Sequence, residues 1–384
     1  MSTQTQKYTR NSPYQSRMLV NVLMTDADSE KETRHVELEL EPGMEYTPGD
    51  AVGILPENRP SEVAEVLAAL KFKGDERVLD HYKVEISLEE AIRTRLAIGK
   101  LTRGSVNSYA KIAPATVTGL DDLKLLALPD NRSKAEEYVW GREFIDLITE
   151  HPGGITEPQQ LFTVLARLTP RMYSIASSQA LVKDAVHTIV RVVRYTSHRR
   201  ERQGLCSGHL GERAPVGSTI PVFLHANANF RLPEDTNTPV IMVGPGTGIA
   251  PFRSFLQHRK AYGHKGDNWL FFGEQRRASD FLYREDLEGM HKDGILTRLD
   301  TAFSRDQSHK IYVQDRMQEN AGELYKWLER GAHFYVCGDA TRMAKDVETA
   351  LLDSIAKGHN CTPDVAQEYL ATMKKEKRYQ LDVY

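Results

Sequence analysis

Apolar runs alternate with helical patterns through the second half of the chain, and no other feature restricts its fold as much. The apolar runs are Val240–Val243, Trp269–Phe272, Ile295–Leu299 and Phe334–Val336, at intervals of about 30 residues. Helical patterns lie between or after them, at Pro251–Lys260, Arg284–Lys292, Val313–Arg330, Thr341–Lys357 and Pro363–Lys375. Strands joined through helices pair in parallel, and the helices then cover both faces of the sheet. We therefore predict an α/β domain with a parallel sheet over residues 233–384.

The first half carries apolar and alternating runs that are typical of antiparallel strands. They are Met18–Met24, His35–Leu40, Ala51–Leu55, Met172–Ala176, His187–Tyr195 and Thr219–Leu224. Helical spacing interrupts them at Ser61–Leu70, Leu88–Arg95 and Tyr138–Thr149. We predict an antiparallel β-barrel over residues 17–59 and 161–232 with a helical insert over 60–160. The polar residues 1–16 are predicted to be flexible.

Bulk composition limits the classes of function. The 384 residues exceed what one hydrophobic core usually serves. The net charge of −3 gives no general attraction to nucleic acid or anionic membranes, and no apolar run predicts a membrane-spanning helix or a signal peptide. Cys206, Cys337 and Cys361 are too few and too far apart for a disulfide framework or a four-cysteine metal site. We expect a cytoplasmic protein without a protein-bound metal.

A glycine-rich loop, Gly244-Pro-Gly246-Thr247-Gly248, follows the first run of the α/β half and precedes a helical pattern. Glycines let the backbone approach a pyrophosphate, and the helix N-terminus offers free N–H groups to it. Ile249 stands where the third glycine of G-x-G-x-x-G would fall, and no acidic ribose ligand is evident around Glu274. The context favours dinucleotide binding, with an ordinary tight turn as the alternative.

A basic, hydroxyl-rich cluster follows the third run of the α/β half, at the edge where parallel sheets bind ligands. It consists of Ser304, Arg305, Lys310, Tyr312 and Gln314. A 2′-phosphate needs Arg or Lys charge together with hydroxyl donors, and an aromatic ring can stack on adenine. With the glycine loop, this cluster favours NADP(H) over NAD(H). The alternative is a solvated basic loop.

Four further motifs are informative only in combination. The strand Arg171–Ser174 can offer a cation, an aromatic ring and a hydroxyl to a ligand, but such strands are also common in structural sheets. The Gly204–Leu210 loop is either a phosphate-binding helix start or a simple turn. Cys337 is either a small core residue or a thiol at the ligand edge, and Tyr384 is either a chain end or a ring that covers a flat cofactor.

Together these motifs resemble the ferredoxin–NADP reductase superfamily, in particular the FAD/NADPH portion of the sulfite reductase flavoproteins in its diflavin-reductase branch. The resemblance covers about residues 12–384 and rests on Leu168–Gln179, Pro239–Phe255, Cys337–Glu348 and Asp382–Tyr384. It implies an FAD-binding antiparallel β-barrel with a helical connecting insert, followed by an NADP-binding α/β domain.

The resemblance also implies roles for individual residues. FAD contacts are expected from Arg171, Met172, Tyr173, Ser174, Ile189, Val190, Arg191, Tyr195, Gly204, Leu205, Cys206, Ser207 and Tyr384. NADP(H) contacts are expected from Gly244, Gly246, Thr247, Gly248, Ser304, Arg305, Lys310, Ile311, Tyr312, Val313, Gln314 and Asp346. Ser174, Cys337, Asp382 and Tyr384 are expected along the hydride path, with Tyr384 moving aside for nicotinamide. Arg191 departs from the small residue that the family tends to have at this position.

The activity implied by the resemblance is an NADPH-dependent FAD reductase that passes electrons to a separate carrier. The expected carrier is an FMN protein or flavodoxin that serves a sulfite reductase hemoprotein. A ferredoxin partner, and a scaffold that binds FAD and NADP(H) without turnover, are the alternatives. Members of this branch usually carry a flavodoxin domain before the barrel, and residues 1–50 contain none. The loop His198–Arg202 is interpreted as a solvated hairpin or as a docking patch for an acidic electron carrier.

Overall fold

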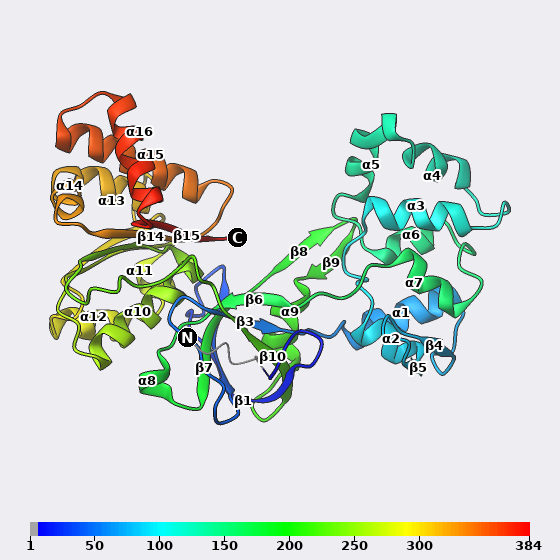
Figure 1. Cartoon of the computed structure of the whole chain (residues 1–384). Coiled ribbons are helices and arrows are strands. Elements are labelled where there is room, and N and C mark those ends of the chain that lie inside the picture. The colour runs from blue at the N-terminus through cyan, green and yellow to red at the C-terminus, as the bar shows by residue number, and fades with distance from the viewer. Residues whose placement is uncertain (1–6) are drawn as a thin grey trace. The chain divides into compact units, whose positions relative to one another are not determined.

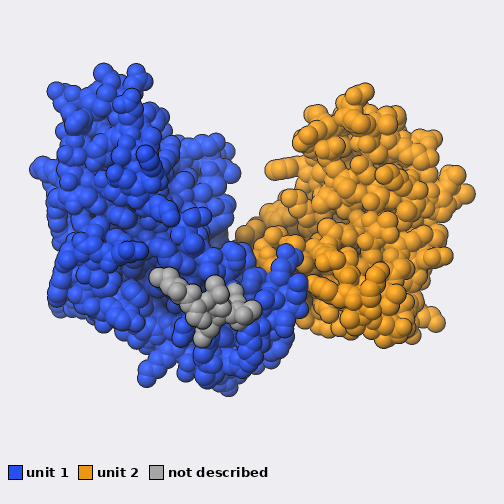
Figure 2. Space-filling view, viewed as in Figure 1, with its two compact units in different colours: residues 1–54, 172–192, 214–384 blue, residues 55–171, 193–213 orange. Residues whose placement is uncertain are grey.

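The computed structural model describes residues 7–384, which divide into two compact units (Figure 2). Unit 1 comprises the chain up to Ile54, Met172–Val192 and Ala214–Tyr384, and unit 2 comprises Leu55–Arg171 and Val193–Arg213. Of the N-terminal segment predicted to be flexible, residues 1–6 lie outside the described residues. Residues 14–16 already belong to the first strand, so the prediction was wrong for them.

A six-stranded sheet in the order β6-β3-β10-β1-β2-β7 forms the first part of unit 1. Its strands are β1 (Tyr14–Leu23), β2 (Glu32–Glu39), β3 (Ala51–Ile54), β6 (Arg171–Ser174), β7 (Ala185–Val192) and β10 (Thr219–His225), with the short helix α8 (Gln179–Val182) between β6 and β7. The pairs β1–β2, β1–β10, β3–β10 and β2–β7 are antiparallel. A bridge between Ile175, which follows β6, and Thr188 of β7 joins the two edges of the sheet, as in a barrel. The predicted antiparallel fold is confirmed.

A five-stranded parallel sheet, of which Figure 1 labels β14 and β15, forms the second part of unit 1. Its strands lie in the order β13-β12-β11-β14-β15. Its strands are β11 (Val240–Val243), β12 (Asn268–Glu274), β13 (Arg298–Phe303), β14 (His333–Gly338) and β15 (Tyr379–Val383). Its helices are η4 (Gly246–Ile249), α10 (Ala250–Ala261), α11 (Arg277–Asp280), α12 (Arg284–Lys292), α13 (Val313–Glu319), α14 (Ala321–Glu329), α15 (Met343–His359) and α16 (Pro363–Lys375). The predicted α/β fold is confirmed, and β15 adds a strand that was not predicted.

Successive side chains of the parallel strands enter two different cores. Ile241 and Val243 of β11 belong to the core that also holds residues of α13, α14, α15 and α16. Val240 and Met242 belong to the core that also holds residues of α10 and α12. Because all four β11 residues are buried, helices cover both faces of the sheet, as its continuous apolar runs indicate.

Two predicted elements of this part have different bounds in the structure. The predicted strand Ile295–Leu299 begins instead at Arg298, because the N–H groups of Ile295 and Leu296 bond back to the Met290 carbonyl after Gly294 turns with a φ of 75°. The predicted helix Val313–Arg330 is two helices, because the chain leaves helical geometry at Asn320.

Unit 2 is mainly helical and has a core of its own. Its elements are α1 (Pro60–Leu70), β4 (Arg77–Leu79), β5 (Glu85–Ser87), α2 (Leu88–Thr94), α3 (Arg103–Ile112), α4 (Leu120–Leu126), η1 (Pro129–Asn131), α5 (Arg132–Val139), α6 (Phe144–Glu150), η2 (Pro158–Gln160), α7 (Leu161–Val164), β8 (Arg194–Ser197), β9 (Arg200–Gln203), α9 (Leu205–Gly208) and η3 (His209–Arg213). The predicted helix Tyr138–Thr149 is interrupted near Gly141, whose φ is 71°. Residues 193–213 belong to unit 2, whereas the predicted domain bounds place them in the barrel.

Candidate functional site

A cavity of about 670 Å³ in unit 1 gathers residues from segments that are far apart in the sequence. It lies where the glycine loop after β11 and the residues at the ends of β12, β13 and β14 meet, which is the edge at which open α/β sheets bind ligands. Its lining consists of Lys31, Arg191, Pro245, Gly246, Thr247, Gly273, Glu274, Gln275, Ala302, Ser304, Arg305, Lys310, Tyr312, Val313, Gln314, Gly338, Asp339, Arg342, Met343, Asp346 and Tyr384. Nine of the twelve residues predicted to contact NADP(H) are among them.

The glycine loop owes its path to close backbone contacts. A Cβ atom on Gly248 would lie 2.1 Å from the Cys337 carbonyl oxygen, and one on Gly244 would lie 2.5 Å from the Gly248 oxygen. Gly246 has a φ of 59°, which favours glycine. Gly244 and Gly248 therefore shape the cavity without lining it, while Gly246 and Thr247 lie on its wall.

Of the predicted adenosine-phosphate residues, Ser304, Arg305, Lys310 and Tyr312 lie on the loop between β13 and α13, and Gln314 lies in the first turn of α13. The Ser304 N–H donates to the Glu274 carbonyl at 2.9 Å, and the Arg305 N–H donates to the Gln275 carbonyl at 2.8 Å, so the end of β12 holds the loop. Tyr312 is 43% exposed and lines the cavity, as a stacking ring would. Ile311 is not part of the lining, and it packs against the core that also holds Val313 and Met317 of α13.

Three charged residues on the cavity wall were not singled out by the sequence. The Lys31 ammonium donates to the Glu274 carboxylate at 2.7 Å, and the Glu274 side chain is only 4% exposed. Arg342 also lines the cavity, one residue before α15. Lys31 lies on the loop between β1 and β2, 243 residues before Glu274, and no local sequence signal points to that contact.

The Asp339 carboxylate binds the N–H groups at the start of α15, so these groups are not available to a bound anion. The carboxylate accepts hydrogen bonds from the N–H groups of Arg342 at 2.9 Å and Met343 at 3.2 Å, and from the Thr341 hydroxyl at 2.7 Å. These bonds, with that of the Thr341 hydroxyl foremost, lower the pKa of Asp339. A bound phosphate is therefore left with the cations of the cavity and the N–H groups of the glycine loop.

Three predicted hydride-path residues meet at one carboxylate oxygen. The Ser174 hydroxyl of β6 donates to Asp382 Oδ2 at 2.6 Å, and the Cys337 thiol of β14 lies 3.6 Å from the same atom. Cys337 and Asp382 are register partners of β14 and β15, so the sheet sets their separation. Cys337 is fully buried, and this burial, with the nearby Asp382 carboxylate, raises the pKa of its thiol well above the usual range.

Tyr384 is an exposed ring on a fixed backbone. Its N–H donates to the Gly338 carbonyl at 3.0 Å, and its own carbonyl accepts from Ala340 at 3.1 Å. Its hydroxyl is 2.9 Å from that of Thr247, yet the residue is 65% exposed. The ring therefore offers a held aromatic surface beside the glycine loop.

The predicted FAD residues divide between the two units. In unit 1, Met172 is 45% exposed, whereas Ile189 and Val190 are buried and could contact a ligand only through their backbone. Tyr173 and Ser174 are half-buried, and Arg191 lines the cavity described above.

In unit 2, Arg171 and Tyr195 are exposed. Gly204 to Ser207 begin the four-residue helix α9, where Cys206 and Ser207 are buried. The Ser207 hydroxyl accepts from the Val193 N–H at 3.2 Å.

The basic loop His198–Arg202 joins β8 and β9 as a hairpin, but most of its charge is paired. Arg200 forms an ion pair with Glu65. Arg202 is only 3% exposed and bonds to both Glu143 and Asp146, so the interpretation as a solvated loop is wrong for it. Arg199 stays exposed, so the loop offers fewer unpaired cations than the alternative of a docking patch assumes.

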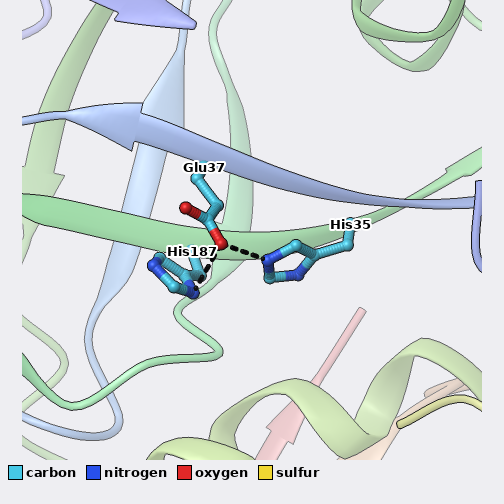
Figure 3. Close-up of side chains that lie close together, drawn as sticks. All are labelled: His35, Glu37 and His187. Atoms are coloured by element: carbon cyan, nitrogen blue, oxygen red, sulfur yellow. Dashed lines mark hydrogen bonds and ion pairs between the residues drawn. The ribbon is translucent and has the colours of Figure 1, made fainter. Parts of the chain in front are cut away.

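A second polar cluster lies among the barrel strands and consists of His35, Glu37 and His187 (Figure 3). Glu37 Oε1 lies 2.9 Å from His35 Nε2 and 3.5 Å from His187 Nδ1. The other His35 nitrogen lies 2.6 Å from the Tyr283 hydroxyl. Burial lowers the pKa of both histidines, for His187 to about 4. Because both His35 nitrogens have protein partners, we interpret the cluster as a hydrogen-bond network that joins β2 and β7 to Tyr283, before α12.

Among the described residues, no helix combines the length and the apolar character that crossing a membrane requires.

The fold and the cavity define an oxidoreductase class with separate flavin and nicotinamide-dinucleotide parts, and family models agree. The FAD binding domain family matches residues 6–209, and the oxidoreductase NAD-binding domain matches residues 242–349. The chain therefore belongs to the FAD binding domain family, and an oxidoreductase NAD-binding domain follows the FAD domain along the sequence. These matches confirm the prediction that the chain binds FAD and NAD(P)(H).

Curated relatives resemble almost the whole chain. The sulfite reductase [NADPH] flavoprotein alpha-component of Bacillus subtilis (strain 168) is 42% identical over 379 residues, which are 98% of this chain and 62% of the relative. The proteins of the same name from Yersinia enterocolitica and Cronobacter sakazakii are each 45% identical over 98% of this chain, and over 61% and 62% of their own length. The resemblance stated from the sequence is confirmed. The chain spans about three fifths of the length of these relatives.

Proposed function

We propose that the chain is an NADPH-dependent FAD reductase that passes electrons to a separate protein carrier. The convergence of Ser174, Cys337 and Asp382 on one carboxylate oxygen carries this proposal. Ser174 comes from β6, whereas Cys337 and Asp382 come from the paired strands β14 and β15, and all three lie in the same unit as the cavity. A scaffold that only binds nucleotides has no need of a hydroxyl, a thiol and a carboxylate held in this way.

The cavity supports NADPH over NADH. Ser304, Arg305 and Lys310 lie together on its wall and offer a hydroxyl and two cations to a 2′-phosphate. Tyr312 offers its ring to adenine from the same loop. The names of the relatives include NADPH, which agrees with this choice.

The residues around Tyr384 fit a flat cofactor such as FAD. The Tyr384 ring is exposed but held, and the exposed Met172 lies on β6 two residues before Ser174. When bound, FAD supplies the chemistry that accepts a hydride and releases electrons one at a time. Ser174, Tyr173 and the backbone of Ile189 to Arg191 are the contacts that we propose within unit 1.

The chain's own groups position protons and exclude water. Asp382 accepts a hydrogen bond from the Ser174 hydroxyl and so fixes the direction of that hydroxyl. Cys337 keeps its proton at neutral pH because burial raises its pKa. We propose that the ring of Tyr384, whose backbone N–H donates to the Gly338 carbonyl next to Cys337, covers this cluster and moves when nicotinamide binds. Arg305 and Lys310 hold the far end of the nucleotide.

The carrier proposed is an FMN protein or flavodoxin that serves a sulfite reductase hemoprotein. The support is the name of the relatives, which are flavoprotein components of sulfite reductase.

An anaerobic reduction experiment tests the enzyme proposal. The FAD-loaded protein is mixed with NADPH or NADH, and the flavin absorbance is followed. We expect bleaching within seconds with NADPH and much slower bleaching with NADH. Absence of bleaching refutes a reductase, and equal rates refute the NADPH assignment. Adding oxidised flavodoxin or ferredoxin to the reduced protein then tests the carrier, and faster reoxidation by ferredoxin contradicts our choice.

A further inference from the structure

An acidic side chain of the loop between β1 and β2, Glu30, contacts Arg305, which is predicted to bind NADPH. The Glu30 carboxylate forms an ion pair with the Arg305 guanidinium, although 275 residues separate them. Neither side chain is buried, since 58% of Glu30 and 37% of Arg305 is exposed. Arg305 is thus already engaged by an anion of the chain.

This loop is held against the α/β part by several bonds. The Asp26 N–H donates to the Ser279 carbonyl at 3.0 Å, and the Ser29 hydroxyl donates to the fully buried Asp280 carboxylate. The next residue after Glu30, Lys31, reaches Glu274 on the cavity wall. Glu30 is therefore positioned by anchored neighbours on both sides.

We propose that Glu30 is an internal competitor of the 2′-phosphate for Arg305 and so sets how tightly NADPH and NADP⁺ are held. This inference rests on the proposed NADPH function. The Glu30 carboxylate and a 2′-phosphate carry charges of the same sign, so both cannot lie on one guanidinium without repulsion. Nucleotide binding must displace Glu30.

Arg276 gives the displaced carboxylate another partner. Its guanidinium lies 3.9 Å from the same Glu30 oxygen that pairs with Arg305. Glu30 can therefore turn from Arg305 to Arg276 when phosphate arrives, and return when the product leaves. In this way the loop weakens binding without blocking the cavity, which favours release of NADP⁺ after hydride transfer.

Ligand titrations of the FAD-loaded protein test the competition. The probes are 2′,5′-ADP and 5′-ADP, which differ only in the 2′-phosphate. We expect Glu30→Gln to lower the Kd for 2′,5′-ADP by about two- to fivefold, the range of an exposed ion pair, and to leave the Kd for 5′-ADP unchanged. The gain should shrink at high salt.

Two controls separate competition from general charge effects. Asp28→Asn removes the same charge from an exposed residue of the same loop and should change neither Kd. In an Arg305→Ala background, Glu30→Gln should not change the Kd for 2′,5′-ADP further, because the guanidinium for which Glu30 competes is absent.

An unchanged or weaker affinity of Glu30→Gln for 2′,5′-ADP overturns the inference, as does an equal gain in Asp28→Asn. If the wild-type protein binds the two probes equally, the NADPH assignment itself fails, which is a distinguishable result.

Discussion

The proposed hydride end and the proposed phosphate end of the site are built in opposite ways. At the hydride end, Ser174, Cys337 and Asp382 are held by strands of two sheets, and their polar atoms meet within 3.6 Å. At the phosphate end, Arg305 and Lys310 lie on an exposed loop, and a second loop already pairs one of them. The polar groups of the first end are held by strand pairing, whereas the charges of the second end are exposed on loops.

This difference predicts that one end controls the reaction rate and the other controls the affinity for the nucleotide. Fixed hydrogen bonds act on the rate of a reaction, because only groups already in place lower its barrier. Exposed cations act on affinity, because they contact a part of the ligand that does not react. Substitutions at the two ends should therefore change different kinetic constants.

The largest effect is expected at Ser174. Ser174→Ala removes the hydroxyl that Asp382 fixes, and we expect the limiting rate of flavin reduction at saturating NADPH to fall by about 100-fold. Stopped-flow absorbance under anaerobic conditions measures it. The matched control, Ser304→Ala, removes a hydroxyl from the phosphate end and should raise the Kd while leaving the limiting rate within about twofold. Equal losses of rate in both variants would break the comparison.

A smaller effect, confined to affinity, is expected at Arg305. A charge-assisted hydrogen bond contributes about 1.5–3 kcal/mol, and the exposure of this side chain places it at the lower end of that range. Arg305→Ala should raise the Kd for NADPH about tenfold and leave that for NADH unchanged. An equal loss for both nucleotides would show that Arg305 supports the fold rather than the 2′-phosphate.

At Tyr384 the expected effect is a few-fold. Aromatic stacking contributes about 0.5–1.5 kcal/mol, which the ring gives up when nicotinamide enters. Tyr384→Ala should therefore narrow the preference for NADPH over NADH, and turnover with NADPH should fall if NADP⁺ release becomes limiting. Steady-state kinetics with both nucleotides measure the preference. Unchanged selectivity, with an unchanged flavin spectrum on adding NADP⁺, would mean that the ring is only a chain end.

The smallest effect is expected from the ionisation of Cys337. Its raised pKa keeps the thiol protonated, because deprotonation begins only as the pH approaches the pKa from below. The limiting rate should therefore show no inflection from this residue between about pH 6 and pH 9.

Iodoacetamide should label the partly exposed Cys361 before the buried Cys337. Rapid labelling of Cys337 would contradict its burial.

Sequence patterns predicted the fold well where periodicity was strong and failed where a backbone bond decided the outcome. The β11 run and the helices α12 and α16 agree with their predicted bounds. The strand after α12 was placed too early, because a positive φ at Gly294 sends the chain back toward Met290.

The candidate site could be predicted in its parts but not in its contacts. Ser174, Cys337 and Asp382 were each singled out, yet their shared oxygen depends on the pairing of β14 with an unpredicted β15. Glu30 reaches Arg305 and Lys31 reaches Glu274 only because a barrel loop contacts the α/β part, and no local pattern encodes such contacts.

The independence of the two ends is the central claim, and the Ser174→Ala/Arg305→Ala double variant tests it most directly. The measurement is the ratio of the limiting reduction rate to the NADPH Kd, from stopped-flow data on the two single variants, the double variant and the wild type. Independent sites give free-energy changes that add, so the fold-losses of the single variants should multiply in the double variant. A double variant no worse than the poorer single variant would contradict the account, because the two ends would then act as one.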